Sequence, residues 1–494
     1  MNILLVPLDE RPCNYEFPKM ILPPSADVTL TTLPRTLLGH KKEPGNLTGI
    51  SDWIRAHIET CDAAVISLET LLFGGLLPSR VHYHRFEDLE QRLIELRDRI
   101  VEAKRTRRFT LFLYGLVMRT PSYSSADEEP DYYADFGEHL FRTAYLSHKE
   151  TCTALSADEK QTLDHLRSSI PVTVKQDYEH RRDINRRILI RAGELFADGL
   201  ADAFTIPQDD SAVYGYGARD RHLVMDAFRA HASGKRVLSY PGADEVGCSL
   251  VCLAAQSEQT AVRVWIETFD SRAARLVPKY ESLPLIESAQ LQIRACGALP
   301  ARSVEQADVL LALNTGTDSG VEASDQSERD MTPFVSRIRD LSTTHSLPVI
   351  VADCAYPNGG DTSLVTEIDA QDLWDAVLSY AGWNTAGNSL GTALAQGVLG
   401  FRADDTAHTR ANLIYRLCDD WAYQACVRPQ LSPRDLTDPP RVAQHINTVF
   451  ERHIPRAAAY GYRVDTLYFP WNRLFEVGLG VSRSTHAAVG VSGR

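Results

Sequence analysis

The amino-acid sequence predicts an α/β protein, and we expect a (β/α)₈ TIM-like barrel with insertions. Two observations lead to this fold class. Short apolar runs rich in β-branched residues recur along the chain, and most are continuous rather than alternating, which is typical of parallel strands covered on both faces. Segments with helical spacing lie between the runs, as at 86–105 and 180–199, and such alternation indicates a parallel sheet with right-handed crossovers.

Ten apolar runs are candidate strands, which is more than one barrel needs. If 26–33 and 262–269 are accessory, eight runs remain, and a (β/α)₈ barrel has eight strands. These eight are 2–8, 63–68, 109–118, 203–207, 236–242, 307–314, 348–354 and 376–383. The alternative is a two-part doubly wound parallel sheet that divides near residues 255–300.

The predicted barrel occupies residues 1–400, with insertions near 120–200 and 255–300. Residues 401–494 differ in character, because two helical stretches flank a proline-rich turn and a strand-like segment follows them. We therefore expect this region to form a C-terminal cap of helices and strand.

Composition excludes several classes of partner for this 494-residue chain. The formal net charge of −13 leaves no basic surface for nucleic acid or for an anionic membrane, and no apolar stretch approaches the ~20 residues of a membrane span. Nine cysteines are scattered without a CxxC pair, which favours reduced thiols and a cytoplasmic location. The oligomeric state is left open, a homo-oligomer included.

Acidic, amide and aromatic side chains follow the ends of the predicted strands. Functional residues collect at the carboxyl ends of parallel strands in barrels and in open sheets alike. Carboxylates and amides beside an aromatic wall are typical of a site for a small carbohydrate, although each Asp or Asn could instead cap a helix. The predicted substrate-binding residues are Asp9, Glu10, Arg11, Glu69, Arg119, Asp244, Glu245, Asn358, Asp361, Trp383, Asn384 and Asn388. For Asp9, Glu10 and Arg11, a buried ion-pair network is the alternative.

The segment IPQDDSAVYGYG places Asp209 and Asp210 side by side at the end of an apolar run. Two neighbouring carboxylates repel when both are ionised, so the arrangement costs free energy unless it has a use. Glycoside hydrolysis needs one carboxyl that holds a proton and one group that stabilises positive charge at the anomeric carbon. Asp209 and Asp210 are therefore the predicted catalytic residues of a glycosidase, and either one together with Glu69 or Glu245 is the alternative pair.

Two other functions are compatible with the carboxylate and amide groups that follow the predicted strands. Carboxylates and amides also suit Mg²⁺, Mn²⁺ or Ca²⁺, so a metal-dependent hydrolase, lyase or isomerase is an alternative. A non-catalytic sugar-binding protein is another. The sequence contains no nucleotide-binding loop, no HExxH and no zinc spacing, and we predict no cofactor.

Six motifs together resemble the bacterial family known as domain of unknown function 4127: PLDERPCN, ETLLFGGLLPSR, QDDSAVYG, GADEVG, YPNGGD and GWNTAGNSLGTALAQ. This resemblance spans nearly the whole chain and carries no known mechanism. The Asp-Asp pair alone is similar to that of hexosaminidases of the O-GlcNAcase type, which are barrels that use the substrate's 2-acetamido group as nucleophile. That similarity implies that Asp209 orients the acetamido group, that Asp210 is the general acid, and that Tyr214 and Asn384 or Asn388 hold the sugar.

Overall fold

The computed structural model divides the protein into two compact units. The first unit consists of Met1–Pro18, Asp27–Ala255 and Val277–Leu291, and the second of Lys19–Ala26, Gln256–Leu276 and Gln292–Arg494. The structure describes residues 1–24, 27–196, 199–231, 236–256, 259–316, 320–403 and 405–483.

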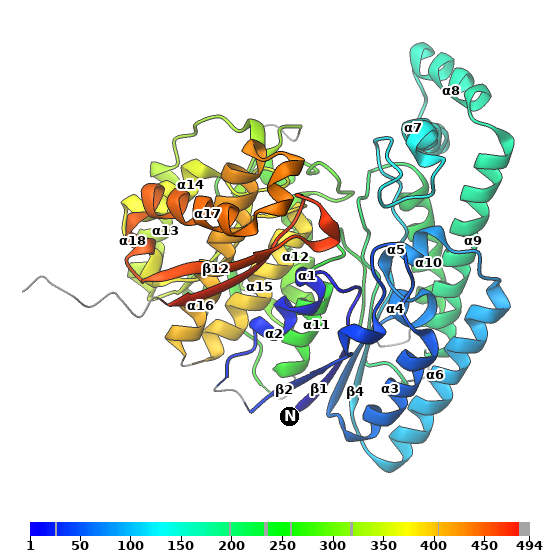
Figure 1. The fold of residues 1–494 in the computed structure, drawn as a ribbon, viewed down its shortest axis with the longest axis horizontal. Coiled ribbons are helices and arrows are strands. Elements are labelled where there is room, and N and C mark those ends of the chain that lie inside the picture. Colours follow the sequence, from blue (N-terminus) through cyan, green and yellow to red (C-terminus); the bar gives the residue numbers. More distant parts are fainter. Residues whose placement is uncertain are drawn as a thin grey trace, which may run out of the picture. The chain divides into compact units, whose positions relative to one another are not determined.

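The first unit is built on a six-stranded parallel sheet with the order β2-β1-β3-β4-β5-β6 (Figure 1). Its strands are β1 (Asn2–Val6), β2 (Thr29–Thr32), β3 (Ala63–Ser67), β4 (Thr110–Tyr114), β5 (Ala203–Thr205) and β6 (Arg236–Leu238). The chain adds β2 on one side of β1 and all later strands on the other side. This reversal between β1 and β3 is the kind of switch point at which doubly wound sheets bind ligands.

Helices cover both faces of the middle of the first sheet, which is why β1, β3 and β4 are apolar without alternation. Leu4 and Val6 of β1 pack in one cluster with apolar residues of α3 (Leu47–His57), α6 (Phe86–Thr106) and α9 (Val172–Leu195). Helix α11 (Val246–Ala255) contacts β1, β3 and β4. The other helices of this unit are α1 (Pro12–Tyr15), α4 (Leu68–Phe73), α5 (Leu76–Val81), α7 (Tyr133–Cys152), α8 (Ala157–Ser169) and α10 (Tyr216–His231).

The second unit contains a five-stranded parallel sheet with the order β11-β10-β9-β7-β8. Its strands are β7 (Arg263–Thr268), β8 (Leu299–Pro300), β9 (Val309–Thr315), β10 (Val349–Cys354) and β11 (Val377–Ala381). Counted along the chain, this is the order of the first five strands of the first sheet. The two units therefore repeat one doubly wound topology, with the second switch point between β7 and β9.

Helices and a small hairpin complete the second unit. They are α13 (Thr332–His345), α14 (Thr362–Ala370), α15 (Ala386–Arg402), α16 (Thr406–Arg416), a π-helix (Leu417–Val427), α17 (Pro439–His453), α18 (Pro455–Ala458), β12 (Tyr462–Tyr468) and β13 (Gly478–Arg483). Two further helices, α2 (Phe17–Met20) and α12 (Leu285–Ala295), each contain a boundary between the units in the chain. The predicted cap, 401–494, lies in the second unit, where α16 contacts β11 and α17 contacts β12.

The predicted α/β class with parallel strands is confirmed. Five of the eight strands counted for a barrel lie in the first sheet and three in the second, and the pairings of the described strands do not show a closed barrel. The runs taken as accessory, 26–33 and 262–269, belong to the sheets as β2 and β7, and β7 lies between β9 and β8. Two parallel sheets agree with the alternative of a two-part doubly wound protein.

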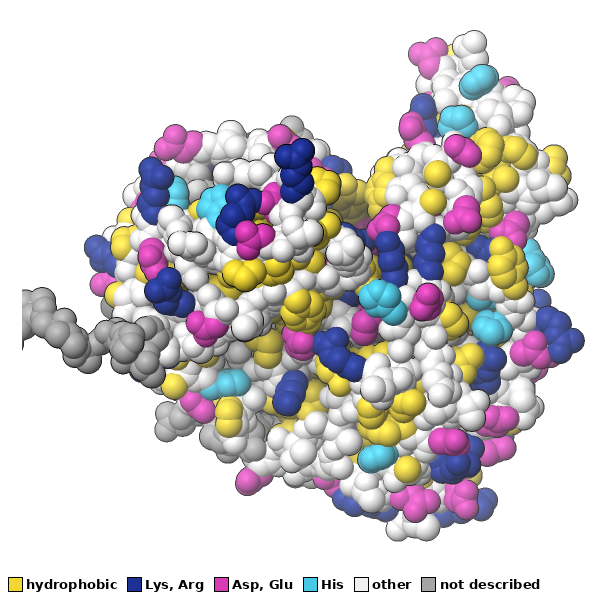
Figure 2. Space-filling view, viewed as in Figure 1, with side chains coloured by type: hydrophobic (Ala, Val, Ile, Leu, Met, Phe, Trp, Pro, Cys, Tyr) yellow, Lys and Arg dark blue, Asp and Glu magenta, His cyan; other side chains and the backbone are white. Residues whose placement is uncertain are grey.

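The exposed surface mixes charges of both signs. On the face drawn in Figure 2, Lys and Arg side chains lie interspersed with Asp and Glu and do not gather by sign. Among the helices in the described ranges, none combines the length and the apolar character needed to cross a membrane.

Candidate functional site

A buried ion-pair network follows β1. Arg11 lies between two carboxylates: its Nε donates to Asp9 Oδ2 (2.9 Å), and its Nη2 donates to Asp9 Oδ2 (2.7 Å) and to Asp244 Oδ1 (2.6 Å). The Asn14 amide donates to Asp9 Oδ1 (2.9 Å) and to Asp244 Oδ1 (3.0 Å). All four side chains are buried. Asp9 and Arg11 thus have the ion-pair arrangement that the sequence analysis gave as the alternative to substrate contact.

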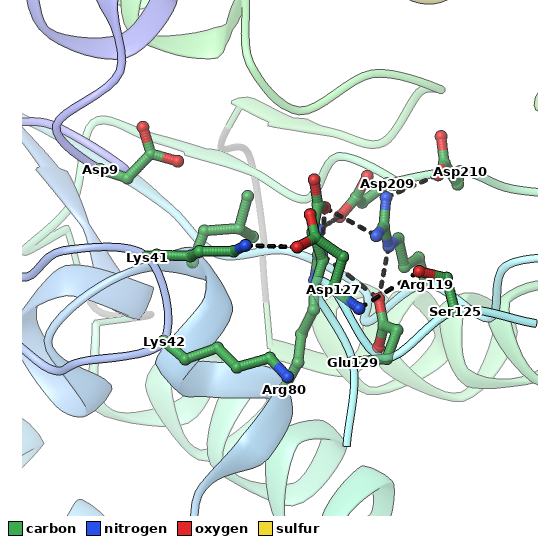
Figure 3. A network of polar contacts seen from close by, with 12 residues as sticks. Asp9, Lys41, Lys42, Arg80, Arg119, Ser125, Asp127, Glu129, Asp209 and Asp210 are labelled. Carbon is green, nitrogen blue, oxygen red and sulfur yellow. Dashed lines mark hydrogen bonds and ion pairs between the residues drawn. The ribbon is translucent and has the colours of Figure 1, made fainter. Parts of the chain in front are cut away.

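Asp209 and Asp210 each pair with a different buried arginine. Arg80 of α5 donates to Asp209 Oδ2, and Arg119, which follows β4, donates through Nη1 to Asp210 Oδ2 (2.8 Å) (Figure 3). The two arginine side chains are 3% and 8% exposed, whereas the two aspartates keep 12% and 15%. The two arginines offset the repulsion expected between adjacent carboxylates, and both aspartates keep an edge accessible to solvent.

Two further carboxylates join the same arginines. Glu128 Oε2 accepts from Arg80 Nη1 (3.0 Å) and from Arg119 Nη2 (2.7 Å), and Glu129 Oε1 accepts from Arg119 Nε (2.7 Å). Asp127, next to Glu128 in the sequence, forms an ion pair with Lys41 (Figure 3). We call Arg80, Arg119, Glu128, Glu129, Asp209 and Asp210 the arginine–carboxylate cluster. With all six ionised its formal charge is −2, which favours a neutral or cationic ligand over an anion.

The backbone and the proton affinity of Asp210 set it apart from an ordinary surface aspartate. Its φ of 32° is rare for a residue other than glycine, and such outliers gather at functional sites. Burial raises the pKa of its carboxyl to about 6, the negative charge of Asp209 adds to this, and Arg119 opposes it. A carboxyl with this pKa can both donate and accept a proton near neutral pH, as a general acid–base catalyst must.

Glu69 lies in the first turn of α4 and lines a pocket together with Asp209. Its Oε1 accepts from the backbone N–H of Leu116 (2.7 Å) and its Oε2 from the Ser67 hydroxyl (3.3 Å). Burial raises the pKa of this carboxyl to about 7, and the nearby charge of Asp209 adds to the effect. Near neutral pH, Glu69 therefore holds a proton for a large part of the time.

The other predicted residues of the first unit lie in different surroundings. Glu245 is fully buried and accepts from the backbone N–H of Ala243 (2.9 Å), and Glu10 accepts from the backbone N–H of Lys41 (3.0 Å). Tyr214 packs edge-on against Tyr145 of α7, with ring centroids 5.4 Å apart.

A second buried network follows the strands of the second sheet. Asp353, at the end of β10, accepts from the Tyr380 hydroxyl (2.8 Å), from Asn314 Nδ2 (2.8 Å) and from the backbone N–H of Asp361 (2.7 Å). Arg329 Nη1 donates to Asp361 Oδ2 (2.6 Å). Burial and the charge of Asp361 raise the pKa of Asp353 to about 6. Asp361 also caps α14, so the capping role considered for such residues applies to it.

The amide and aromatic residues predicted here shape the loops that follow β10 and β11. Asn358 (φ 60°) and Asn384 (φ 50°) have the left-handed backbone that asparagine tolerates, and the N–H of Asn358 donates to the carbonyl of Asn384 (2.8 Å). The Trp383 indole donates to Thr392 Oγ1 (3.3 Å), and Asn388 is buried in the first turn of α15. The predicted site residues are therefore divided between the two units.

The comparison with protein families gives one match. Residues 3–480 fit the model of a family described as protein of unknown function (DUF4127). The chain belongs to this family. The DUF4127 match includes both sheets, which confirms the resemblance that the six motifs carry, and no curated protein matches the chain.

Several polar residues of these networks could not be predicted as site residues from the sequence of this DUF4127 member. Arg80, Glu128 and Glu129 follow no strand directly, although Arg80 ends the motif ETLLFGGLLPSR. In the second unit, Asp419 and Asp420 form another adjacent pair, within the π-helix, and pair with Arg416. The repeated letters DD were their only signal. In the described ranges of the chain, no group of three or more His, Cys, Asp or Glu side chains is placed to hold a metal ion.

We expect Gly360→Ala to destabilise the protein by about 1–3 kcal/mol, the usual cost of overpacking. A Cβ at this position would lie 1.9 Å from the Tyr380 hydroxyl and 3.2 Å from Asp353 Oδ2, so the Tyr380–Asp353 hydrogen bond must give way. Urea denaturation of the full chain measures the loss. Gly217→Ala is the matched control, because its Cβ has nothing within 4 Å and its unfolding midpoint should not fall. Equal midpoints for the two variants would contradict the packing described.

Proposed function

We propose that the protein is a glycoside hydrolase that acts on a small glycoside, with an N-acetylhexosaminide as the favoured substrate class. The observation that carries the proposal is the pairing of each adjacent aspartate with its own buried arginine, with Asp210 left partly exposed. The pKa of Asp210, raised to about 6, suits a group that gives up and regains a proton in each cycle.

The two aspartates would have different roles in the reaction. Asp210 would protonate the glycosidic oxygen as the bond from that oxygen to the anomeric carbon breaks. The carbonyl oxygen of the substrate's own acetamido group would attack the anomeric carbon and close an oxazoline ring. Asp209, paired with Arg80, would accept from the acetamido N–H and stabilise the positive charge on the ring. Water would then open the ring, with the Asp210 carboxylate as base.

The formal charge of the arginine–carboxylate cluster supports this choice. A site with net negative charge stabilises the oxocarbenium-like transition state of glycoside cleavage. A closed (β/α)₈ barrel is not required, because loops also converge at the carboxyl ends of an open parallel sheet. We place the enzyme in the cytoplasm because all nine cysteines are free thiols.

The test is a panel of chromogenic glycosides, N-acetylhexosaminides included, given to the metal-stripped protein and then repeated with Mn²⁺. We expect turnover without metal. Turnover only with Mn²⁺ would make the carboxylates metal ligands and favour the metal-dependent alternative. Saturable sugar binding without turnover would favour a binding protein instead.

A further inference from the structure

Four polar side chains on one face of α9 contact two segments of the candidate site. They are Tyr178, Arg181, Arg182 and Asn185, whose spacing of three and four residues places them side by side on the helix. Tyr178 and the two arginines are buried. An arginine carries five N–H donors in a fixed, planar fork, so a single side chain can hold several backbone carbonyls at once.

Arg181 holds the end of α5, the helix that carries Arg80. Its Nη1 donates to the carbonyl of Arg80 (3.0 Å) and its Nε to the carbonyl of His82 (3.0 Å). The Asn185 amide donates to the carbonyl of Ser79 (2.9 Å). The last carbonyls of a helix have no donor within that helix, so α9 supplies the donors that α5 lacks.

Arg182 holds the segment after β4 in the same way. Its Nη1 donates to the carbonyl of Arg119 (2.8 Å) and its Nη2 to the carbonyl of Met118 (2.8 Å). The Tyr178 hydroxyl also donates to the carbonyl of Arg119 (3.1 Å). Two consecutive arginines of α9 thus fix the backbone of the two arginines that pair with the adjacent aspartates.

Both of these α9 arginines are neutralised by carboxylates outside the arginine–carboxylate cluster. Arg181 Nη2 donates to Asp177 Oδ2 (2.8 Å). Arg182 donates through Nε (3.0 Å) and Nη2 (2.8 Å) to Asp220 Oδ2, and this pair is 1% and 5% exposed. The α9 arginines therefore need no charge from the cluster, and they are buried too deeply to contact a ligand. Their effect on the site passes through the backbone that they hold.

We propose that Arg181 and Arg182 are positioning residues that keep a separate cation beside each of the two adjacent aspartates. Arg181 acts through Arg80, because it fixes the carbonyl of that residue. Arg182 acts through Arg119 for the same reason. The positioning itself does not depend on the proposed hydrolysis, whereas its effect on turnover rests on that function.

Arginine side-chain NMR of the full-length protein, made with isotope-labelled arginine, tests the two pairs separately. The Nε–H signals of Arg80 and Arg119 are assigned by their absence from Arg80→Lys and Arg119→Lys. Lysine in place of an α9 arginine keeps the charge but loses the planar fork. We expect Arg182→Lys to shift the Arg119 signal and to leave the Arg80 signal in place. Arg181→Lys should do the reverse.

Arg187→Lys is the matched control, because Arg187 lies on the same helix, is half exposed and pairs with Asp183 of α9. Neither signal should move in this control. If Arg181→Lys and Arg182→Lys lower the free energy of unfolding but leave both signals in place, the two arginines only stabilise the fold and the proposal is wrong. Signals that move together in either variant would also overturn it.

A milder variant keeps the test available if a lysine variant does not fold. Tyr178→Phe keeps the ring and removes the hydroxyl that contacts the Arg119 carbonyl. We expect it to shift the Arg119 signal and not the Arg80 signal. An Arg119 signal that stays in place would contradict the view that α9 positions this residue through its carbonyl.

The Asp210 carboxyl provides a second readout that needs no substrate. Burial raises its pKa to about 6, and among the neighbouring charges Arg119 has the largest effect and lowers it. Infrared spectra of the protein minus those of Asp210→Asn follow the protonated carboxyl across pH. In an Arg182→Lys background the midpoint should rise by about 1 pH unit, the lower end of what a paired arginine contributes. An unchanged midpoint would mean that Arg119 keeps its place, and would overturn the proposal whether or not any glycoside is cleaved.

With an accepted glycoside, the pH profile links the positioning to turnover. Because the proposed general acid works in its protonated form, the fall in turnover at high pH should move upward in Arg182→Lys by the same amount as the Asp210 midpoint. A purely structural role for Arg182 would lower turnover at every pH and leave the shape of the profile unchanged.

Discussion

Asp210→Asn is expected to lower kcat on an accepted glycoside by about 10²- to 10⁴-fold, the usual contribution of a general acid. The amide has nearly the shape of the carboxyl and can still accept a hydrogen bond from Arg119, so the cluster should stay assembled. It cannot donate a proton to the leaving oxygen at neutral pH. Steady-state kinetics measure the loss, and urea denaturation checks that the fold is retained.

The pH dependence of the unmutated protein follows from the same group. A general acid works in its protonated form, and the pKa of Asp210 is about 6. Turnover should therefore fall as pH rises through about 6 for any step limited by leaving-group protonation. Asp226→Asn, on the exposed face of α10, is the control and should change neither kcat nor the profile. Full turnover by Asp210→Asn would remove Asp210 from the mechanism.

Arg119→Met is expected to reduce the free energy of unfolding by about 3–5 kcal/mol, the cost of breaking a buried ion pair from one side. Methionine can fill part of the space of the arginine stem but leaves Asp210, Glu128 and Glu129 without the guanidinium that each of them contacts. Arg80 still reaches the two glutamates, so the cluster loses one of its two cations. Urea denaturation at pH 7 measures the difference.

The pH dependence of the unfolding free energy distinguishes the loss of charge from the loss of packing in Arg119→Met. Carboxylates that have lost their cation take up protons more readily. The reduction in unfolding free energy caused by Arg119→Met should therefore become smaller as pH falls from 7 towards 5. Arg55→Met is the matched control, since Arg55 and its partner Asp52 are both more than half exposed and such a pair contributes about 0–1 kcal/mol. If Arg119→Met reduced the unfolding free energy no more than Arg55→Met does, the cluster would not stabilise the fold.

Local patterns in the sequence determined the elements of this protein and the side chains that follow its strands. A continuous apolar run must be buried on both faces, so β1, β3, β10 and β11 could be predicted from a few residues each. The polar residue after such a run lies at the carboxyl edge of a sheet, whichever strands are its neighbours. This is why the sequence alone could predict that Asp210 follows a strand of a parallel sheet.

Only the tertiary structure decided which strands pair and which charges meet. Parallel strands are joined by long crossovers, so the chain between two strands does not specify their neighbours, and eight consistent strands could be counted as one barrel. The division into two sheets, of which the second repeats the order of the first five strands of the first, depends on contacts between distant residues. The ion-pair partners of Arg80 and Glu128 could not be predicted from the neighbouring sequence, because a charged side chain can pair with any opposite charge that the fold brings near it. The fold brings them beside Asp209 and Asp210, where the attraction between buried opposite charges makes two repelling carboxylates stable together.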